Sequence, residues 1–257
     1  MPTIHPTAAV DTKARLAEDV SVGPFSIIEG DVEIGKGSQI HSHVLVANGA
    51  RIGENCQVHH GTAISTIPQD LKFSGENTTL EIGDNTIVRE FCDLNRGTKH
   101  RGKSAIGKEC FLMAYAHVAH DCLIGDHVII ANGVQLAGHV TIEDWVIIGG
   151  LVAVHQFCSV GQHAFIGGGF RAVQDVPPYI LAASEPLTYK GLNAIGLKRR
   201  GFSSETIGAL RKCYRIIYRS RLNTRHALEK IKSEMEMIPE IRAVIAFIEK
   251  SERGIIH

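Results

Sequence analysis

Aliphatic side chains recur at every sixth position along most of this chain, and few folds can accommodate such a pattern. The uninterrupted runs are Ile4–Ile64, Ile82–Leu94 and Ile106–Ile166. Periodicity this long predicts stacked units of similar structure, none of which can bury its apolar residue alone. A 3.6-residue or heptad period would lose this pattern within two turns, so the runs are not helices.

The other columns of the six-residue unit favour short strands and tight corners. The residue after the aliphatic one is often Gly. A tight corner needs residues without bulk, and Gly also reaches backbone angles that other residues avoid. The fourth residue after the aliphatic one is small or β-branched, as in Val20, Ser26 and Val32, and β-branched residues suit strands. We therefore expect a three-sided prism with one unit on each face and about 18 residues in each coil.

This hexapeptide pattern resembles that of the left-handed parallel β-helix acyltransferases, and the resemblance implies a mainly β fold of that kind for residues 1–190. The left hand comes from the resemblance alone, because parallel crossovers are usually right-handed. The repeat fades near Pro177-Pro178, and tandem prolines end regular strands.

Residues 191–257 have a helical pattern and form a small second domain in this interpretation. Ser203 is a suitable N-cap for a helix whose apolar stripe runs from Ile207 to Tyr218. A second helix is expected over about 224–236, and Pro239 suits the first turn of a third. This bundle could also cover the open end of the β-helix, as solenoids require.

The repeat is interrupted twice, near residues 65–80 and 95–104. Both segments are too polar for the interior of a coil, so we expect them to leave the prism as loops. Loops on a rigid scaffold often carry binding groups, although surface insertions without function are also tolerated.

The composition restricts location and partners. The chain has 257 residues with 27 basic and 27 acidic side chains, and no apolar run approaches the length of a membrane helix. The repeat begins at Ile4, which leaves no room for a signal peptide, so we expect a cytoplasmic protein. We expect no cofactor, no nucleic-acid partner and no transmembrane segment.

Five of the six cysteines fall in the small-residue column of the repeat: Cys56, Cys92, Cys110, Cys122 and Cys158. The chain has no C-x-x-C pair, and a cytoplasmic compartment is reducing. We therefore interpret these cysteines as small core residues rather than as metal ligands or disulfides.

The segment 116–122 concentrates groups that can move protons. His117, His120 and Asp121 lie within five positions, and histidine is the side chain best suited to proton transfer near neutral pH. The adjacent carboxylate could orient an imidazole ring or stabilise its charged form.

Stacking of residues about 18 apart adds partners to this segment. His120 is expected to lie beneath Gly138, and Gly138 beneath Gln156, while Asp121 lies beneath His139. His155 precedes Gln156 in the sequence. A histidine beside a backbone N–H that no side chain shields suits acyl transfer, because the ring accepts the proton of an attacking hydroxyl while the N–H stabilises the oxyanion.

The same histidines admit a metal interpretation. Three histidines on one edge of a β-helix could hold zinc, as in the β-helical carbonic anhydrases. However, His117 and His120 need not face the same way, and Asp121 adds no obvious open metal site.

Several strings resemble the UDP-N-acetylglucosamine acyltransferase family, which catalyses the first step of lipid A synthesis in Gram-negative bacteria. The similarity covers essentially the whole chain, including Gln69–Lys72 and the C-terminal helices. The strings are His117–Cys122, Leu136–Val140, Gly149–Cys158, Gln174–Tyr179 and Gly196–Phe202.

The resemblance implies transfer of an (R)-3-hydroxyacyl group from acyl carrier protein to the sugar 3-hydroxyl of UDP-GlcNAc by a homotrimer, with active sites between neighbouring rods. His120 matches the general base, Asp121 its partner and Gly138 the oxyanion donor. Gly168 matches an acyl-length ruler, and Gly there suggests a long chain. The remaining matches are to substrate-binding positions: Asp70, Lys72, His117, His139, His155, Gln156, Asn193, Arg199 and Arg200.

The segment 198–225 carries nine basic side chains and one acidic side chain, Glu205. In a chain with no net charge, this asymmetry could steer an acidic partner such as an acyl carrier protein, or it could be a solvated helix face.

Two departures from the family concern the acceptor. Asn95 stands where some members have His, and Ala194-Ile195 follows Asn193 where some members have Glu. A 3-amino analogue of the sugar is therefore an alternative acceptor. Three more interpretations stay open: the N-acyltransferase of the same pathway, which has an extra N-terminal domain, a metal-dependent β-helix enzyme, and a non-catalytic scaffold.

Overall fold

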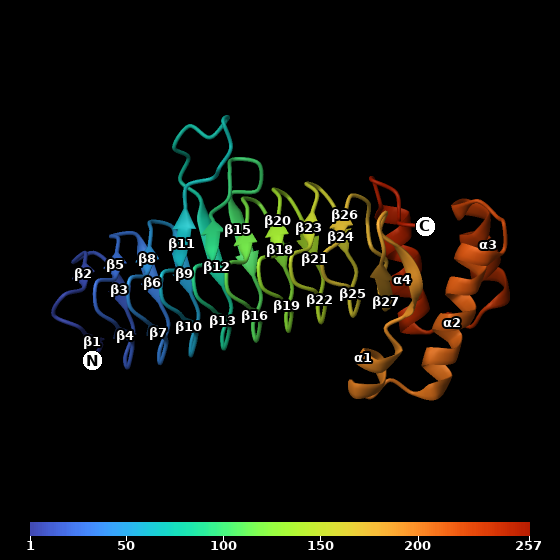
Figure 1. The fold of residues 1–257 in the computed structure, drawn as a ribbon, viewed down its shortest axis with the longest axis horizontal. Helices are drawn as coiled ribbons and strands as arrows, with labels where there is room; N and C mark the ends of the chain where they lie inside the picture. The colour runs from blue at the N-terminus through green and yellow to red at the C-terminus, as the bar shows by residue number, and fades with distance from the viewer.

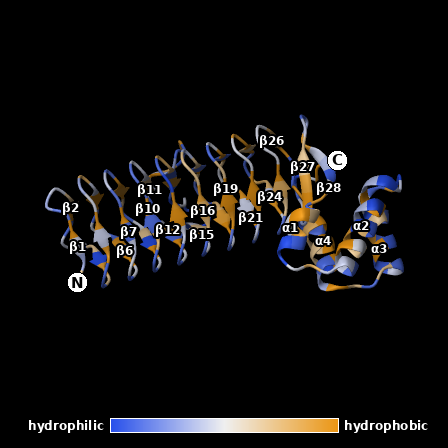
Figure 2. Ribbon diagram, turned by 60° about the horizontal axis from the view of Figure 1, so that its bottom comes forward, coloured by the Kyte–Doolittle hydropathy of each residue, from blue (hydrophilic) through white to orange (hydrophobic).

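The chain forms a long left-handed parallel β-helix with four helices at its C-terminal end (Figure 1), as seen in a computed structural model that describes residues 1–257. Hydrophobic residues repeat from coil to coil along the rod (Figure 2). No helix is both long enough and apolar enough to cross a membrane.

Three sheets form the faces of the rod, and each strand lies in register with the corresponding strand of the next coil. The eleven-stranded sheet contains β1 (Thr3–Ile4), β4 (Ser21–Val22), β7 (Gln39–Ile40), β10 (Gln57–Val58), β13 (Ile87–Val88), β16 (Phe111–Leu112), β19 (Ile129–Ile130), β22 (Ile147–Ile148), β25 (Phe165–Ile166), β27 (Ile180–Ala183) and β28 (Thr188–Leu192). The nine-stranded sheet contains β2 (Ala9–Val10), β5 (Ile27–Ile28), β8 (Leu45–Val46), β11 (Ala63–Thr66), β14 (Asp93–Asn95), β17 (His117–Val118), β20 (Gln135–Leu136), β23 (Ala153–Val154) and β26 (Arg171–Ala172). The eight-stranded sheet contains β3 (Arg15–Leu16), β6 (Val32–Ile34), β9 (Ala50–Ile52), β12 (Thr79–Ile82), β15 (Lys103–Ile106), β18 (Leu123–Ile124), β21 (Thr141–Ile142) and β24 (Ser159–Val160).

The strand register follows the predicted coil length. Thr3 pairs with Ser21 and His117 with Gln135, a separation of 18 residues in both cases. The separation rises to 30 for Gln57 and Ile87, and to 24 for Ile87 and Phe111. These longer coils contain the two connections that leave the rod, residues 67–78 and 96–102 (Figure 1). Both connections are shorter than the predicted loops near residues 65–80 and 95–104.

Three edges run along the rod where the faces meet. The loop edge joins the nine-stranded to the eight-stranded sheet and includes residues 67–78, 96–102, 119–122, 137–140 and 155–158. The apolar edge joins the eleven-stranded to the nine-stranded sheet and includes residues 23–26, 89–92, 113–116, 149–152 and 167–170. The third edge joins the eight-stranded to the eleven-stranded sheet and includes residues 125–128, 143–146 and 161–164.

The interior confirms both apolar columns of the repeat. From Val22 onward the aliphatic column is buried, and so are the small side chains four positions later. All six cysteines are buried and free, as expected for the five in the repeat. Burial raises the pKa of the Cys122 thiol to about 12, which keeps it protonated and unreactive.

Of the two reasons expected for the glycine column, the unusual backbone angle is wrong and the need for a residue without bulk is confirmed. Gly35 does not have a positive φ, but a Cβ there would lie 2.6 Å from the carbonyl carbon of Gly53, so the column allows close stacking of coils. Positive φ angles occur two positions later, for example 53° at Asn55 and 58° at Asp121. Asn and Asp tolerate this conformation better than most residues.

The three predicted helices are confirmed as α2 (Ser204–Arg219), α3 (Thr224–Glu234) and α4 (Pro239–Lys250). The Ser203 side chain caps α2 by accepting a hydrogen bond from the Thr206 N–H. The sequence did not predict the short α1 (Ala194–Arg199) or the antiparallel pair β27 and β28.

The helices continue the core of the rod. The Tyr214 hydroxyl, buried in α2, donates to the Pro178 carbonyl over 2.5 Å. The Ser251 hydroxyl donates to Asp175, and the Ile256 N–H donates to the Asp175 carbonyl. These contacts fix the helices on the last coil, so the end of the β-helix is covered.

Candidate active site

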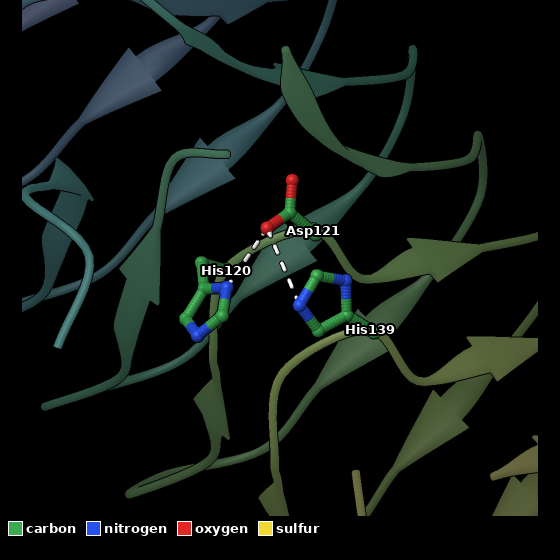
Figure 3. A group of neighbouring side chains, drawn as sticks. All are labelled: His120, Asp121 and His139. Atoms are coloured by element: carbon green, nitrogen blue, oxygen red, sulfur yellow. Dashed lines mark hydrogen bonds and ion pairs between the residues drawn. The ribbon is translucent and has the colours of Figure 1, made fainter. Parts of the chain in front are cut away.

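His120 and Asp121 form a hydrogen-bonded pair on the loop edge (Figure 3). His120 Nδ1 lies 2.8 Å from Asp121 Oδ2, and the Asp121 side chain has no exposed surface. Asp121 Oδ1 accepts hydrogen bonds from the N–H groups of Thr98 and Arg101, while Oδ2 accepts one from the Thr98 hydroxyl. The connection 96–102 therefore closes over the carboxylate.

These contacts determine the charge of Asp121. Burial raises its pKa, but the hydrogen bonds from His120 and Thr98 outweigh burial and lower the pKa below its usual value. The carboxylate is ionised at neutral pH. Since its oxygen can only accept, His120 carries a proton on Nδ1 and, when neutral, has its lone pair on Nε2.

Gly138 lies against the other side of the His120 ring. A Cβ at Gly138 would lie 2.7 Å from both Cε1 and Nε2 of His120, so only glycine leaves room for the ring. The Gly138 N–H donates to no acceptor in the protein. An unshielded donor therefore lies beside the ring that holds a free lone pair.

His139 completes this cluster, and its ring is enclosed. Its Nε2 lies 3.8 Å from Asp121 Oδ2, and its ring stacks on Phe157 at a centroid distance of 4.4 Å. The His120 and His100 rings meet it edge to face. Burial, together with His120, lowers the pKa of His139 despite the opposing effect of Asp121, so His139 is neutral at pH 7.

His117 lies in β17 of the nine-stranded sheet and has a different partner. Its Nδ1 lies 3.1 Å from Asp93 Oδ2. It lines one end of a groove of about 440 Å³. Six of its ten lining residues are hydrophobic, and the full set is His117, Gln135, Leu136, Ala137, Ala153, Val154, His155, Arg171, Ala172 and Val173.

Four other predicted site residues also belong to the loop edge. His155 and Gln156 are exposed one coil beyond Gly138. Asp70 and Lys72 lie in the connection 67–78, where the Lys72 N–H donates to Asp70 Oδ1. The predicted stacking on one edge is confirmed by the strand register. The residues concerned are His120, Asp121, Gly138, His139, His155 and Gln156.

Asn193 and Arg200 lie beside the third edge and do not meet His120 within one chain. The Asn193 side chain caps α1 and donates to the His163 carbonyl over 3.0 Å. Arg200 lies 3.3 Å from His163 Nδ1 and 5.2 Å from the centre of the Trp145 ring. Burial and the Arg200 charge lower the pKa of His163 to about 4, so its ring is neutral.

Arg199 and Gly168 are exposed at places away from the cluster. Arg199 ends α1, and Gly168 lies on the apolar edge, where a Cβ would lie 3.0 Å from the Gly150 carbonyl oxygen. The sequence-derived set therefore divides among all three edges of the rod.

The geometry of the cluster suits hydrogen bonding better than metal coordination. His120, Asp121 and His139 offer ligand atoms within 4.8 Å of one another. However, Asp121 already accepts three hydrogen bonds from the connection 96–102 and one from His120. His117, the third histidine of the zinc interpretation, hydrogen bonds Asp93 instead.

Sequence reasoning missed Thr98, Arg101, Asp93 and the groove. Thr98 and Arg101 lie in a segment without periodicity, so nothing in the pattern aligned them with Asp121. Asp93 could have been found, because it stands one coil before His117 once the interruption is subtracted.

Comparisons with known proteins give consistent matches over the whole chain. Residues 175–256 match a family described as Udp N-acetylglucosamine O-acyltransferase, Domain 2. Residues 13–48 and 103–138 match the bacterial transferase hexapeptide family. Two relatives are named acyl-[acyl-carrier-protein]–UDP-N-acetylglucosamine O-acyltransferase. That from Thiobacillus denitrificans is 46% identical and covers 100% of both chains, and that from Chlorobaculum parvum is 50% identical and covers 99% of this chain and 97% of its own.

Solved structures agree with these matches. The UDP-N-acetylglucosamine acyltransferase from Bacteroides fragilis superposes with a TM-score of 0.97 at 45% identity, covering 98% of this chain and 99% of its own. The enzyme of that name from Francisella novicida has a TM-score of 0.96 at 37% identity, covering 99% of this chain and 94% of its own.

Proposed function

The chain belongs to the UDP-N-acetylglucosamine O-acyltransferase family, and we propose that it transfers an (R)-3-hydroxyacyl group from acyl carrier protein to the 3-position of UDP-GlcNAc in lipid A synthesis. Its relatives are enzymes, which removes the non-catalytic interpretation. The relatives give no support to a carbonic anhydrase activity.

His120 acts as the general base in this proposal. Its Nε2 accepts the proton of the sugar 3-hydroxyl as the oxygen attacks the thioester carbonyl, and buried Asp121 stabilises the resulting imidazolium. The Gly138 N–H donates to the oxyanion of the tetrahedral intermediate. When the intermediate collapses, the C–S bond breaks, the ester remains on the sugar and the imidazolium returns its proton to the thiolate.

One observation supports this assignment above the others. The fully buried Asp121 lies 2.8 Å from His120 Nδ1, while the opposite side of the ring lies against Gly138. A histidine, a buried carboxylate and an unshielded N–H therefore lie as the proposed roles of base, orienting group and oxyanion donor require.

The groove on the nine-stranded sheet is the proposed acyl site. It begins at His117, three residues from His120, and its floor includes Ala137 and Ala153. Small floor residues leave space for an alkyl chain along the rod, and the far end includes Val173. Gly168, at the nearby turn of that last coil, would then limit chain length.

The acidic carrier protein is proposed to dock beside α2. A groove of about 700 Å³ separates β28 from α2 and is lined by five basic side chains: Lys190, Arg211, Lys212, Arg215 and Arg219. This lining favours the functional interpretation of the basic segment over a merely solvated face, because the charges converge on a concave surface.

A homotrimer would complete the site. Asn193, Arg199 and Arg200 do not reach His120 of their own chain, so we propose that they hold the nucleotide at the site of a neighbouring copy, with Asp70, Lys72, His139, His155 and Gln156. The apolar edge supports close contact between copies, because it exposes Phe25, Phe91, Tyr115 and Leu151 by 46–75%.

Neither of the two departures from the family, at Asn95 and at Ile195, determines whether the sugar acceptor carries a 3-hydroxyl or a 3-amino group. Asn95 is buried and donates to the Thr66 hydroxyl over 2.6 Å, while Ile195 is 69% exposed on α1. We propose the 3-hydroxyl sugar and retain the 3-amino sugar as the alternative. A cytoplasmic location and a division into residues 1–190 and 191–257 also remain proposals.

The test uses purified protein, UDP-GlcNAc, its 3-amino analogue and 3-hydroxyacyl carrier proteins of graded length. Wild-type protein should acylate UDP-GlcNAc, and kcat/KM across the set identifies the preferred acceptor and chain. His120→Ala should abolish transfer while leaving the assembly folded. An active His120→Ala protein would remove His120 from the role of base.

A further inference from the structure

His163 lies where the third edge of the rod meets the short helix α1, and it contacts the residues at both ends of that helix. The Asn193 side chain, which caps the start of α1, donates to the His163 carbonyl over 3.0 Å. Arg200, which follows the last residue of α1, has its Nη1 atom 3.3 Å from His163 Nδ1. One residue of the rod therefore holds both residues that flank α1.

Aromatic packing fixes the His163 ring. The ring lies parallel to the Trp145 ring at a centroid distance of 6.1 Å and to the Tyr179 ring at 5.6 Å. The Phe202 ring meets it edge to face at 4.9 Å, and the residue is buried. A ring packed on three sides has little freedom to rotate, so Nδ1 stays directed at Arg200.

The contact with Arg200 determines the protonation state of His163. A guanidinium can only donate, so Nδ1 accepts and the neutral ring carries its proton on Nε2. A protonated ring would instead place a second cation against Arg200. Burial and the Arg200 charge lower the pKa of His163 to about 4, so the ring is a neutral acceptor at pH 7.

Arg200 has no counter-ion within the chain. Its guanidinium lies 5.2 Å from the centre of the Trp145 ring, and its side chain hydrogen bonds His163 but no carboxylate. The residue is half-buried, and burial lowers the pKa of its guanidinium from the usual value. A partly desolvated cation with unused N–H donors favours an anionic ligand, and a guanidinium matches the oxygens of a diphosphate.

We propose that His163 is a positioning residue for nucleotide binding: its Nδ1 atom orients Arg200, and its carbonyl orients Asn193, toward the UDP group of the acceptor. This inference rests on the proposed function, in which those two residues hold the nucleotide at a neighbouring copy. With one nitrogen held by His163 and one face covered by Trp145, Arg200 presents its remaining donors in a single direction. The ligand then does not have to order a flexible side chain when it binds.

His163→Phe tests the role of Nδ1. Phenylalanine keeps an aromatic ring in the stack but removes the acceptor. The turn accommodates it, because Phe91 and Phe157 have φ angles of 55° and 64° in equivalent turns, compared with 59° at His163. We expect KM for UDP-GlcNAc to rise about 10-fold, as for loss of one hydrogen bond to a charged group. The values of kcat and of KM for the acyl carrier protein should stay close to those of wild type.

His127→Phe is the matched control. The His127 ring also stacks on Trp145, at a centroid distance of 3.9 Å, and its φ angle is 57°. Its Nδ1 lies 3.2 Å from Glu109 Oε2, and it has no contact with Arg200. The same substitution in the same stack should therefore leave KM for UDP-GlcNAc unchanged.

His163→Asn should restore binding without restoring the ring. The side-chain oxygen of asparagine can occupy the place of Nδ1, and asparagine tolerates a positive φ better than most residues. KM for UDP-GlcNAc should therefore be closer to wild type in His163→Asn than in His163→Phe. A role in packing alone predicts the opposite order, because phenylalanine preserves the stack and asparagine does not.

A double-mutant cycle determines whether His163 acts through Arg200. Arg200→Met should raise KM for UDP-GlcNAc by itself, and adding His163→Phe should raise it no further. Thermal midpoints of all variants identify folding defects. If His163→Phe does not fold, His163→Leu replaces it, because Leu151 has a φ angle of 61° in an equivalent turn.

Two results would overturn the inference while the proposed function stands. One is an unchanged KM for UDP-GlcNAc in the folded variant that lacks the acceptor, and the other is an additive effect in the double variant. Failure of the proposed function has a different signature: wild-type protein would acylate neither UDP-GlcNAc nor its 3-amino analogue, and that result would remove both.

Discussion

Thr98 binds both oxygens of Asp121. Its N–H lies 3.0 Å from Oδ1 and its hydroxyl lies 2.7 Å from Oδ2. Thr98 belongs to the connection 96–102, so an interruption of the repeat supplies the groups that enclose the proposed catalytic carboxylate.

Thr98→Val should weaken catalysis without removing His120. The hydroxyl donates a charge-assisted hydrogen bond, and its loss leaves Asp121 less able to orient His120. We expect kcat to fall about 10-fold to 100-fold with KM nearly unchanged. Steady-state kinetics measure the change, and Thr141→Val, on β21 of the eight-stranded sheet, provides a control of equal chemistry. A full loss of activity in both variants would indicate a folding defect.

Asp121→Asn should be most damaging at neutral pH. By analogy with other acid–histidine pairs, we expect a loss on the order of 10³-fold to 10⁴-fold in kcat, because the amide favours the wrong His120 tautomer.

The pKa of Asp121 is lowered in the folded protein, so its ionised form stabilises the fold at pH values above the usual carboxyl range.

The sign of the pH effect follows from that lowered pKa. The contribution of Asp121 to stability is present above its unfolded pKa and is lost as pH falls through its folded pKa. Thermal midpoints of wild type and Asp121→Asn should therefore differ more at pH 7 than under strongly acidic conditions. A difference that is constant with pH would contradict the assigned charge state.

Gly138→Ala should displace the His120 ring. The added Cβ would lie 2.7 Å from Nε2, closer than any stable contact allows. A shift of about 1 Å at a reacting group can reduce the rate on the order of 100-fold. Gly150→Ala is the control at the equivalent position of another turn, where the Cβ would lie 3.3 Å from the Asn132 oxygen. Equal activities in the two variants would contradict the proposed role of Gly138.

The repeat made the long-range part of the site predictable. Once strands stack in register, sequence separation converts directly into proximity, as for His120 and Gly138. That conversion holds only while the period holds. Thr98 contacts Asp121 from a connection with no period, so its side chain could be located only by the fold of that connection.

Partners outside the period were also hidden at the C-terminal end. The Asn193 side chain caps α1. The sequence did not predict this helix, because six residues carry no clear periodic pattern. The helix α2 was predictable since its apolar stripe is long and Ser203 precedes it. The pattern of a helix within one chain does not indicate how one rod contacts another. The positions of Arg199 and Arg200 relative to His120 could therefore not be predicted from the sequence pattern.

Arg215→Glu should weaken use of the carrier protein more than the chemical step. The side chain lines the basic groove beside α2, and charge reversal there opposes an acidic partner. We expect KM for the acyl carrier protein to rise about 10-fold at low salt and the difference to shrink as salt screens the charges. Kinetics at two salt concentrations measure this change.

Arg225→Glu is the matched control for this prediction. Arg225 belongs to the same basic segment, but it lies on α3, is 86% exposed and pairs with Glu229 outside the groove. Its reversal should leave KM close to the wild-type value. Equal effects of the two reversals would indicate a general charge effect rather than a docking groove.

Tyr115→Asp should separate the proposed trimer. Tyr115 stacks on Phe91 at a centroid distance of 5.4 Å, and the two rings are 61% and 46% exposed on the apolar edge. Burying such rings against a second copy is favourable, whereas a carboxylate there would lose its hydration without a partner. Sedimentation should give trimers for wild type and smaller species for Tyr115→Asp.

The same variant tests whether copies share a site. If Arg199 and Arg200 act on a neighbouring chain, Tyr115→Asp should lose transfer activity together with the trimer, although His120 and Asp121 remain intact within each chain. Leu71→Asp is the control, because Leu71 is also an exposed apolar residue but belongs to the connection 67–78 on the loop edge. It should remain trimeric. A monomeric Tyr115→Asp protein with full activity would show that each chain holds a complete site.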